Sequence, residues 1–484
     1  MNLLNLARPD LLISDAYVGG NWYPAQSRFA VTNPANGAHL ADVADCSIED
    51  ARAAILVAEK AQKGWSGQTG KERAAILRRW FDLMIAHADD LAAILTAEMG
   101  KPLAEAKGEI LYGASFIEWF AEEAKRVYGD TIPGHQHDKR IVVMKQPVGV
   151  VGAITPWNFP NAMIARKVAP ALAAGCAMVV RPAAETPLSA LAMTKLAEEA
   201  GVPAGVLSVI PSTDSAGIGV EFCENPIMRK ISFTGSTRVG KILMRQGAEQ
   251  IKKLSLELGG NAPFIVFDDA DVDAAVEGAM ISKFRNAGQT CVCTNRIYVQ
   301  DGVYDEFVRK LSKSVAALPV GYGFAQGTAI GPLINDAAVT KMQEHIADAV
   351  AKGGRIDVGG DSHELGGTFF QPTVVSGVTP SMAVAKEETF GPLAAVFRFS
   401  QEDEAIQAAN DTEFGLASYF YSRDLSRVWR VMEGLEYGMV GVNTGLISTE
   451  VAPFGGIKES GHGREGSKYG IEDYLEIKYC CLSV

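Results

Sequence analysis

The chain has few cysteines, few histidines and no excess of basic residues. Its 484 residues include 7 Cys, an odd number spread too thinly for a disulfide framework. The 7 His residues form no metal-binding pattern, so the sequence predicts no metal site. Lys and Arg number 45 against 57 Asp and Glu, and this net charge of −12 excludes nucleic acid as an expected partner.

The sequence also lacks a long uninterrupted apolar segment and a signal peptide. The most apolar region, residues 162–180, is interrupted by Arg166, Lys167 and Pro170, so no membrane association is expected. Residues 1–13 contain leucines but neither a basic start nor a small-residue cleavage site. With 48% hydrophobic residues and sparse cysteine, the composition is typical of a globular protein of the reducing cytoplasm.

What the chain does contain is a regular alternation of short apolar strands and helices. Its length predicts two or three domains. Amphipathic periodicity predicts helices over 50–63, 71–98 and 105–127. Further strands are expected over 140–145, 148–154, 177–180, 206–210, 230–233 and 253–257, and helices over 162–174, 187–200 and 237–250.

A second alternating block runs from residue 263 to about 438, and residues 474–481 have the pattern of a terminal strand. Short buried strands that alternate with helices are typical of parallel sheets covered on both faces. The sequence therefore predicts an α/β fold with two consecutive parallel-sheet units. The terminal strand is expected to pair with another element or another subunit.

Two residues have the chemistry of covalent catalysis. Cys291 lies in the run 284–293, which is neither amphipathic nor turn-like. Glu257 lies between two leucines and just before two glycines. A thiolate is a strong nucleophile, and a carboxylate in an apolar setting has the raised pKa of a general base. These residues are candidates for nucleophile and base.

A glycine-rich turn over 233–240 follows a predicted strand and opens a predicted helix. Free backbone N–H groups at such a helix start suit a diphosphate, and Gly235 allows close approach. With Lys241 the segment nearly matches the loop of nucleotide hydrolases. Ile242, however, stands where that loop requires a magnesium-binding Ser or Thr. A plain turn is the other interpretation.

Asn158 lies between two prolines directly after the apolar strand 148–154. Its side-chain amide could donate to a developing oxyanion, and the alternative is a turn-forming Asn. The segment 386–392 is charged and ends at an aromatic residue and a Gly-Pro turn, and it could equally be exposed surface.

Taken in order, these segments resemble the aldehyde dehydrogenase superfamily across nearly the whole chain. The motifs are P-W-N-F-P, F-T-G-S-T-x-x-G, L-E-L-G-G, G-Q-T-C, E-x-F-G-P and P-F-G-G. The stretch F-R-N-A-G-Q-T-C-V-C-T and the tail G-S-K-Y-G-I-E-D-Y-L-E-I-K-Y are similar to the succinate-semialdehyde dehydrogenase branch.

The resemblance implies a division into three parts and a homo-oligomer, either a dimer or a tetramer. Residues 1–128 and 147–257 would form a Rossmann-like dinucleotide-binding domain, and residues 258–438 a catalytic domain. Residues 129–146 and 439–484 would form an oligomerisation arm and closing segment.

The resemblance also implies a mechanism and a set of cofactor contacts. Cys291 would attack the aldehyde, Asn158 and the Cys291 N–H would hold the oxyanion, and Glu257 would activate water to hydrolyse the thioester. Glu388 would hold the nicotinamide ribose, and Phe390 would pack near it. The full set of implied cofactor-binding residues is Thr155, Trp157, Asn158, Arg181, Ala184, Gly235, Ser236, Leu258, Glu388 and Phe390.

The same branch implies a semialdehyde substrate with a remote carboxylate, succinate semialdehyde being favoured over glutarate semialdehyde or another aldehyde. Arg166, Arg285 and Ser448 are the matching candidates for that carboxylate, because guanidinium groups offer paired donors. Cys293 lies two residues after Cys291 and is either the second half of a redox switch or a bystander thiol.

The sequence departs from the family pattern at the adenosine ribose. Arg181 replaces the usual Lys, and Ala184 replaces a Glu or a Ser. Without a carboxylate at position 184, a 2′-phosphate is not repelled, and Arg binds phosphate well. These residues favour NADP, although the neighbouring Glu185 could turn inward and leave NAD as the coenzyme.

Overall fold

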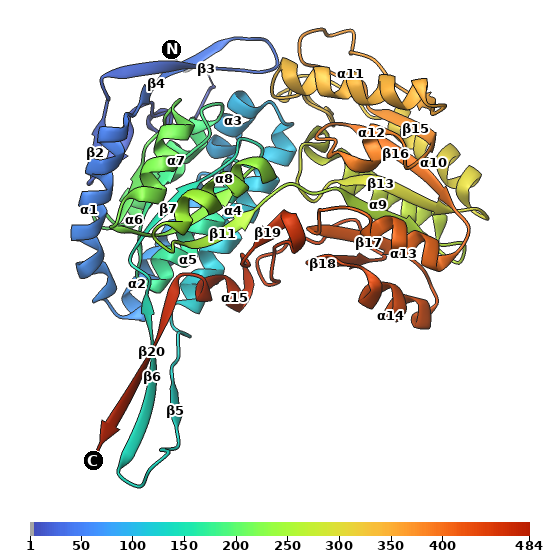
Figure 1. Cartoon of the computed structure of the whole chain (residues 1–484). Coiled ribbons are helices and arrows are strands. Elements are labelled where there is room, and N and C mark those ends of the chain that lie inside the picture. Colours follow the sequence, from blue (N-terminus) through green and yellow to red (C-terminus); the bar gives the residue numbers. More distant parts are fainter. Residues whose placement is uncertain (1–3) are drawn as a thin grey trace.

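The structure is a computed structural model that describes residues 4–484. Two mainly parallel sheets, each covered by helices, lie side by side, and a β-arm projects away from the first of them (Figure 1). This arrangement confirms the predicted α/β class with two parallel-sheet units. No helix within residues 4–484 combines the length and the hydropathy that crossing a bilayer requires.

The first sheet has the strand order β19-β11-β10-β7-β8-β9-β1-β2, and the strands from β11 to β9 are parallel. Its central strands are buried throughout, as expected of apolar runs covered on both faces. The strands are β1 Ala16–Val18, β2 Asn21–Tyr23, β7 Val150–Ile154, β8 Ala177–Arg181, β9 Leu207–Val209, β10 Met228–Thr234, β11 Lys253–Glu257 and β19 Gly461–His462.

The helices of this unit cover both faces of the first sheet (Figure 1). They are α1 Ile48–Ser66, α2 Gly70–Ala86, α3 Ala88–Met99, α4 Leu103–Glu123, α5 Ala162–Ala174, α6 Pro187–Ala200, α7 Ser215–Glu224 and α8 Thr237–Ala248.

One helix prediction was wrong, since the region 71–98 forms two helices, α2 and α3, instead of one. His87 ends the first with non-helical angles, φ −112° and ψ 20°. The Asp90 carboxylate in the first turn of α3 accepts the backbone N–H groups of Ala7 and Arg8 at 2.9 and 2.8 Å. A tertiary contact with the N-terminal segment therefore accompanies the break, and the helical periodicity alone did not show it.

The second sheet has the order β14-β15-β16-β13-β12-β17-β18 and is parallel except at β14. Its strands are β12 Ala262–Val266, β13 Thr294–Gln300, β14 Arg355–Val358, β15 Thr373–Val378, β16 Leu393–Phe399, β17 Ala417–Tyr421 and β18 Met439–Val442. Its helices are α9 Val272–Phe284, α10 Tyr304–Ala316, α11 Asp336–Ala351, α12 Ala383–Lys386, α13 Glu402–Asn410 and α14 Leu425–Gly434.

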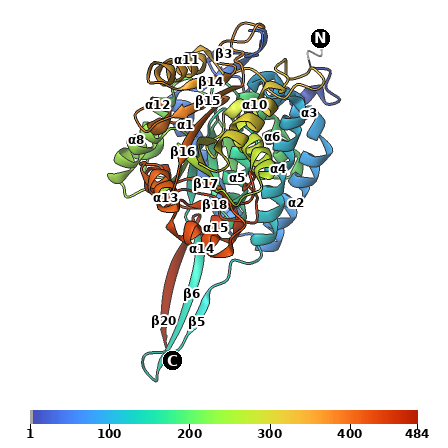
Figure 2. The same cartoon turned by 90° about the vertical axis from the view of Figure 1, so that its right-hand side faces the viewer.

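The β-arm consists of β20, Leu475–Ser483, paired antiparallel with β6, Lys139–Pro147, which also pairs with β5, Asp130–Ile132. Both views show the arm extending beyond the body (Figures 1 and 2). The expected terminal strand thus pairs with another element of the same chain. The remaining elements are η1 Pro9–Leu11, β3 Ser27–Thr32, β4 His39–Asp45, η2 Arg285–Gly288, η3 Lys458–Ser460 and α15 Ser467–Glu472.

The closing segment links both sheets before it enters the arm. β18 pairs with β17 in the second sheet, and β19 pairs with β11 in the first. The division into a dinucleotide-binding part, a catalytic part and an arm remains our proposal. The parallel arrangement places the carboxyl ends of β7, β10 and β11 at one edge of the first sheet, where open α/β folds bind ligands.

Candidate active site

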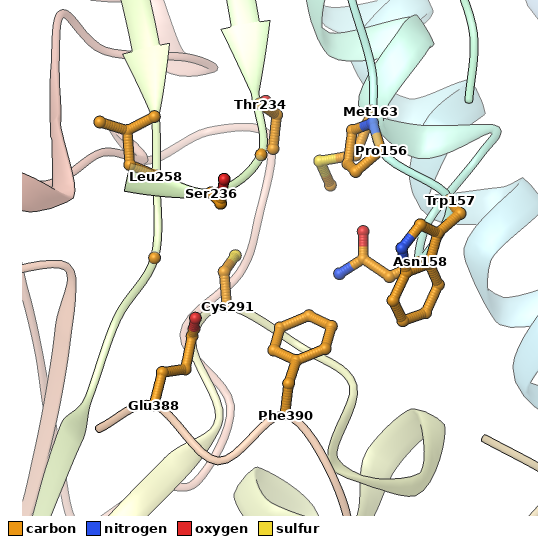
Figure 3. A pocket seen from close by; sticks show the side chains of 12 residues that line it. Pro156, Trp157, Asn158, Met163, Thr234, Ser236, Leu258, Cys291, Glu388 and Phe390 are labelled. Carbon is orange, nitrogen blue, oxygen red and sulfur yellow. The ribbon is translucent and has the colours of Figure 1, made fainter. Parts of the chain in front are cut away.

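A cavity lies at the carboxyl ends of these strands, between the two sheets (Figure 3). Many of the residues singled out in the sequence come together there. The cavity is lined by Pro156, Trp157, Asn158, Met163, Thr234, Gly235, Ser236, Leu258, Gly259, Cys291, Glu388 and Phe390. The Cys291 sulfur and the side chains of Asn158 and Glu388 point into the same space (Figure 3).

Asn158 follows β7 and is buried with its amide toward the Cys291 loop. Its Nδ2 donates a hydrogen bond to the Gln289 carbonyl oxygen at 3.0 Å. An amide nitrogen carries two hydrogens, so a second one is available to an oxygen in the cavity. This is the geometry that an oxyanion donor needs.

Cys291 follows a left-handed backbone turn in which Asn286, Ala287 and Gly288 have φ values of 53°, 52° and 74°. At position 288 a side chain is excluded, because a Cβ would lie 2.5 Å from the Gly391 carbonyl carbon. Burial raises the pKa of the Cys291 thiol to about 12, and the nearby positive charge of Arg166 opposes that rise. Burial therefore favours the neutral thiol of Cys291 over the thiolate that attacks in the implied mechanism.

Glu257 ends β11, and its carboxylate lies beside Gly455, outside the wall of the cavity. Burial raises its pKa well above the usual range, and the negative charge of Glu465 adds to the effect. The raised pKa predicted from the sequence is thus confirmed. Arg166, Lys167 and Arg464 lower it in turn, so the carboxylate belongs to a charged cluster contributed by α5 and the closing segment.

Glu388 and Phe390 enter the cavity from the second sheet's side. The Glu388 Oε1 accepts the backbone N–H of Gly260 at 3.0 Å, and burial raises the pKa of this carboxyl to about 7. The Phe390 ring meets the Trp157 ring edge-on, with centroids 5.7 Å apart. The two aromatic residues form an apolar wall opposite the thiol.

The start of α8 fits the diphosphate of a dinucleotide. Ser236 caps this helix by accepting the Val239 N–H and also lines the cavity. The first N–H groups of a helix have no partner within the helix and suit an anion. A Cβ on Gly235 would overlap the Phe233 ring, and one on Gly240 would lie 2.5 Å from a Leu258 methyl carbon. Both glycines therefore allow the close packing that such a site requires.

Three of the implied cofactor residues lie outside the wall of this cavity. Thr155 is buried next to it, and Arg181 ends β8, where its Nη2 donates to the Ser212 carbonyl at 2.7 Å. Ala184 lines a separate hollow together with Glu98 and Glu185. Ala184 thus lines a different hollow from the one that contains Cys291.

The three candidates for the substrate carboxylate do not share one environment. Arg166 is buried, and its Nη2 forms an ion pair with Glu465 at 2.6 Å. Arg285 and Ser448 line a small hollow together with Thr290 and Val292, the residues on either side of the nucleophile candidate. The Arg285 guanidinium lies 5.2 Å from the Phe159 ring. It is therefore Arg285 and Ser448 that the fold brings together.

Cys293 is buried, and its Sγ donates to the Lys283 carbonyl oxygen at 3.3 Å. Both it and Cys291 are free thiols. Within residues 4–484 no three His, Cys, Asp or Glu side chains gather as they would around a metal ion.

Sequence reasoning missed several residues next to the cavity. Met163 forms part of its wall, Glu465 pairs with Arg166 and Lys167, and Lys101 donates to the Asn158 carbonyl. The only signal for Lys101 was its place in the series Lys101, Glu105 and Glu109, whose spacing of four puts charges on one side of the following helix.

A parallel-sheet fold with a cavity that holds a thiol and borders a helix start suited to a diphosphate is typical of nicotinamide-dependent oxidoreductases. The model of the aldehyde dehydrogenase family matches residues 22–480. The chain therefore belongs to that family and is an aldehyde dehydrogenase.

Relatives of this chain carry different substrate names. It is 63% identical to a succinate-semialdehyde dehydrogenase [NADP(+)] of Escherichia coli, covering 99% of this chain and 100% of the relative. It is 64% identical to a glutarate-semialdehyde dehydrogenase of Pseudomonas aeruginosa, covering 99% of each chain. A crystal structure of succinate-semialdehyde dehydrogenase from Burkholderia pseudomallei superposes with a TM-score of 0.98 at 64% identity, over 99% of this chain and 100% of that one.

Proposed function

We propose that the protein oxidises a semialdehyde with a remote carboxylate, succinate semialdehyde first, with NADP as coenzyme. The observation that carries this proposal is that Arg285 and Ser448 lie in a hollow flanking Cys291. If the aldehyde carbon of a semialdehyde lies at the Cys291 sulfur, the carboxylate at its other end would lie near the Arg285 guanidinium. Glutarate semialdehyde, one methylene longer, is the second candidate because a relative with that name is equally similar.

In the proposed reaction the Cys291 thiol first loses its proton to solvent, and its sulfur then attacks the aldehyde carbon. The carbonyl oxygen becomes an oxyanion held by the free Asn158 N–H. Expulsion of the hydride leaves a thioester on the sulfur. When bound, a nicotinamide coenzyme accepts that hydride. Glu257 then turns from Gly455 toward the thioester and takes a proton from the attacking water, which releases the acid and the thiol.

The residues around the proposed adenosine end support NADP. Position 184 offers a methyl group instead of a carboxylate, and Arg181 lies within three residues of it. Glu185 lines the same hollow as Ala184, and its carboxylate there leaves NAD as the alternative. Lys241, the residue that would bind phosphate in a nucleotide hydrolase, pairs with Glu459 at 2.6 Å, so that alternative gains no support.

The test follows coenzyme reduction with succinate semialdehyde, glutarate semialdehyde and butanal, each with NADP and NAD. We expect the highest kcat/KM for succinate semialdehyde with NADP. A preference for butanal would refute the carboxylate site, and a preference for NAD would refute the coenzyme assignment alone.

Replacement of Arg285 by Ala tests the carboxylate contact directly. Charge-assisted hydrogen bonds contribute about 1.5–3 kcal/mol, so KM for succinate semialdehyde is expected to rise about 10- to 100-fold. KM for butanal, which has no carboxylate, serves as the internal control and stays unchanged. An equal rise for both substrates would contradict the proposed contact.

We further propose that the protein is a homodimer or homotetramer held together through the β-arm, and that it resides in the cytoplasm. The arm carries exposed apolar side chains outside the body, which supports an assembly formed through the arm.

The free state of the cysteines within residues 4–484 supports residence in the cytoplasm.

A further inference from the structure

Three charged residues outside the cavity connect the oxyanion donor to the nucleophile's turn. They are Lys101, Glu105 and Glu109, and together we name them the Lys101 cluster. We propose that the Lys101 cluster positions Asn158 relative to Cys291 for catalysis. None of the three lines the cavity, so each is a positioning residue. The inference rests on the function proposed for Asn158.

Lys101 fixes the backbone of Asn158. Its side chain is buried, and its Nζ donates to Glu109 Oε2 at 2.6 Å and to the Asn158 carbonyl oxygen at 2.8 Å. The same ammonium lies 3.9 Å from the centroid of the Phe159 ring. An ammonium has three N–H donors, so these neighbours satisfy it and leave it one preferred position.

Glu109 fixes the other end of the same loop. Its Oε1 accepts the backbone N–H groups of Asn161 and Ala162 at 2.9 and 3.2 Å. These groups belong to the start of α5, where N–H groups have no partner within the helix. One carboxylate on α4 therefore holds the loop after Asn158, while its other oxygen holds Lys101.

Glu105 extends the connection to the turn before Cys291. Its Oε2 accepts the Asn286 N–H at 2.8 Å, at the first residue of the left-handed turn. The Asn286 side-chain amide in turn donates to the Asn158 carbonyl at 3.0 Å and to the Gln289 carbonyl at 3.2 Å. Because Asn158 Nδ2 also donates to the Gln289 carbonyl, the network closes on itself.

A charged network of this kind holds Asn158 in a defined position more effectively than it stabilises the fold. The cost of desolvating a buried ion pair offsets much of its attraction, so an apolar cluster would stabilise the fold at least as well. Charge-assisted hydrogen bonds are short and directional, which holds a donor in one place. A preorganised oxyanion donor accelerates a reaction by about 100- to 1,000-fold, and displacement of the donor loses part of that factor.

A double-mutant cycle tests the proposal. Lys101→Met keeps the length of the side chain and removes its donors, and Asn158→Ala removes the oxyanion donor. In the otherwise unchanged enzyme, Lys101→Met is expected to lower kcat by about tenfold or more, with little change in KM. In the Asn158→Ala background the same change is expected to lower kcat less than about twofold, since the group it positions is absent.

Arg73→Met is the matched control, because Arg73 is also a buried cation and donates to the Ala173 carbonyl at 3.0 Å, at the opposite end of α5. We expect Arg73→Met to change kcat by the same factor in the otherwise unchanged enzyme and in the Asn158→Ala background. If Lys101→Met lowered kcat by the same factor in both backgrounds, the proposal would be overturned, because a purely structural defect lowers kcat regardless of Asn158.

Glu109→Gln is the second variant, since it keeps the side-chain volume and breaks the pair with Lys101. It is expected to show the same dependence on Asn158. If neither variant folds, judged by circular dichroism and thermal unfolding, the Lys101 cluster serves stability and the proposal is wrong. Absence of aldehyde oxidation by the unsubstituted enzyme would instead refute the proposed function, so the two failures are distinguishable.

Discussion

At the scale of single residues, burial raises the pKa values of the two residues proposed to carry out the chemistry, Cys291 and Glu257. Burial holds the pKa of Cys291 near 12, above the value of 9.0 that is ordinary for a thiol. Burial likewise raises the pKa of Glu257, so this proposed base becomes active only as the pH rises through that pKa. Both shifts disfavour the charged forms when the cavity holds no ligand.

The pH dependence of alkylation checks the state of the thiol. Since only the thiolate reacts, the rate at which iodoacetamide modifies Cys291 in the coenzyme-free enzyme should still be rising at pH 9.0, the ordinary thiol pKa. Mass spectrometry of the peptide that contains Cys291 gives this rate separately from the other cysteines. The Cys291→Ser variant identifies the background, and a plateau near neutral pH would show that the thiol is already ionised.

At the scale of elements, the turn over residues 286–288 precedes Cys291 and fixes the position of this proposed nucleophile. Gly288→Ala is expected to destabilise the protein by about 1–3 kcal/mol and to lower kcat, because the added carbon collides with the Gly391 carbonyl at a left-handed position. Gly353→Ala is the control, since Gly353 is also left-handed, with φ +96°, but has no neighbouring heavy atom within 4 Å. Thermal unfolding and steady-state kinetics of both variants measure the difference, and equal effects would contradict the steric cause.

The elements also show what the sequence could and could not predict. Buried strands such as β7 and β11 were predicted because their apolar runs are local signals. The clustering of Asn158, Ser236 and Cys291 followed from motifs placed at strand ends and from resemblance to the family. Contacts between distant segments left no local signal, so the Asp90 contact at the α2–α3 break and the Arg166–Glu465 ion pair were missed.

At the scale of the whole molecule, the β-arm has no core of its own. Its strand β20 lies at the edge of a small sheet, and Ile477, Tyr479 and Leu482 in this strand are 71%, 59% and 47% exposed. A long apolar edge strand in water favours pairing with another chain. The arm projects from the body in both views, which supports the proposed assembly through the arm (Figures 1 and 2).

Charged substitutions on the arm test this explanation. Ile477→Glu combined with Tyr479→Glu is expected to shift the assembly toward the monomer, because two desolvated carboxylates would oppose association. Light scattering after size-exclusion chromatography measures the mass. Val350→Glu on α11, 46% exposed and at the end of the molecule opposite the arm, is the control and should leave the mass unchanged. A monomeric unsubstituted protein, or an arm variant that assembles normally, would show that the arm does not hold subunits together.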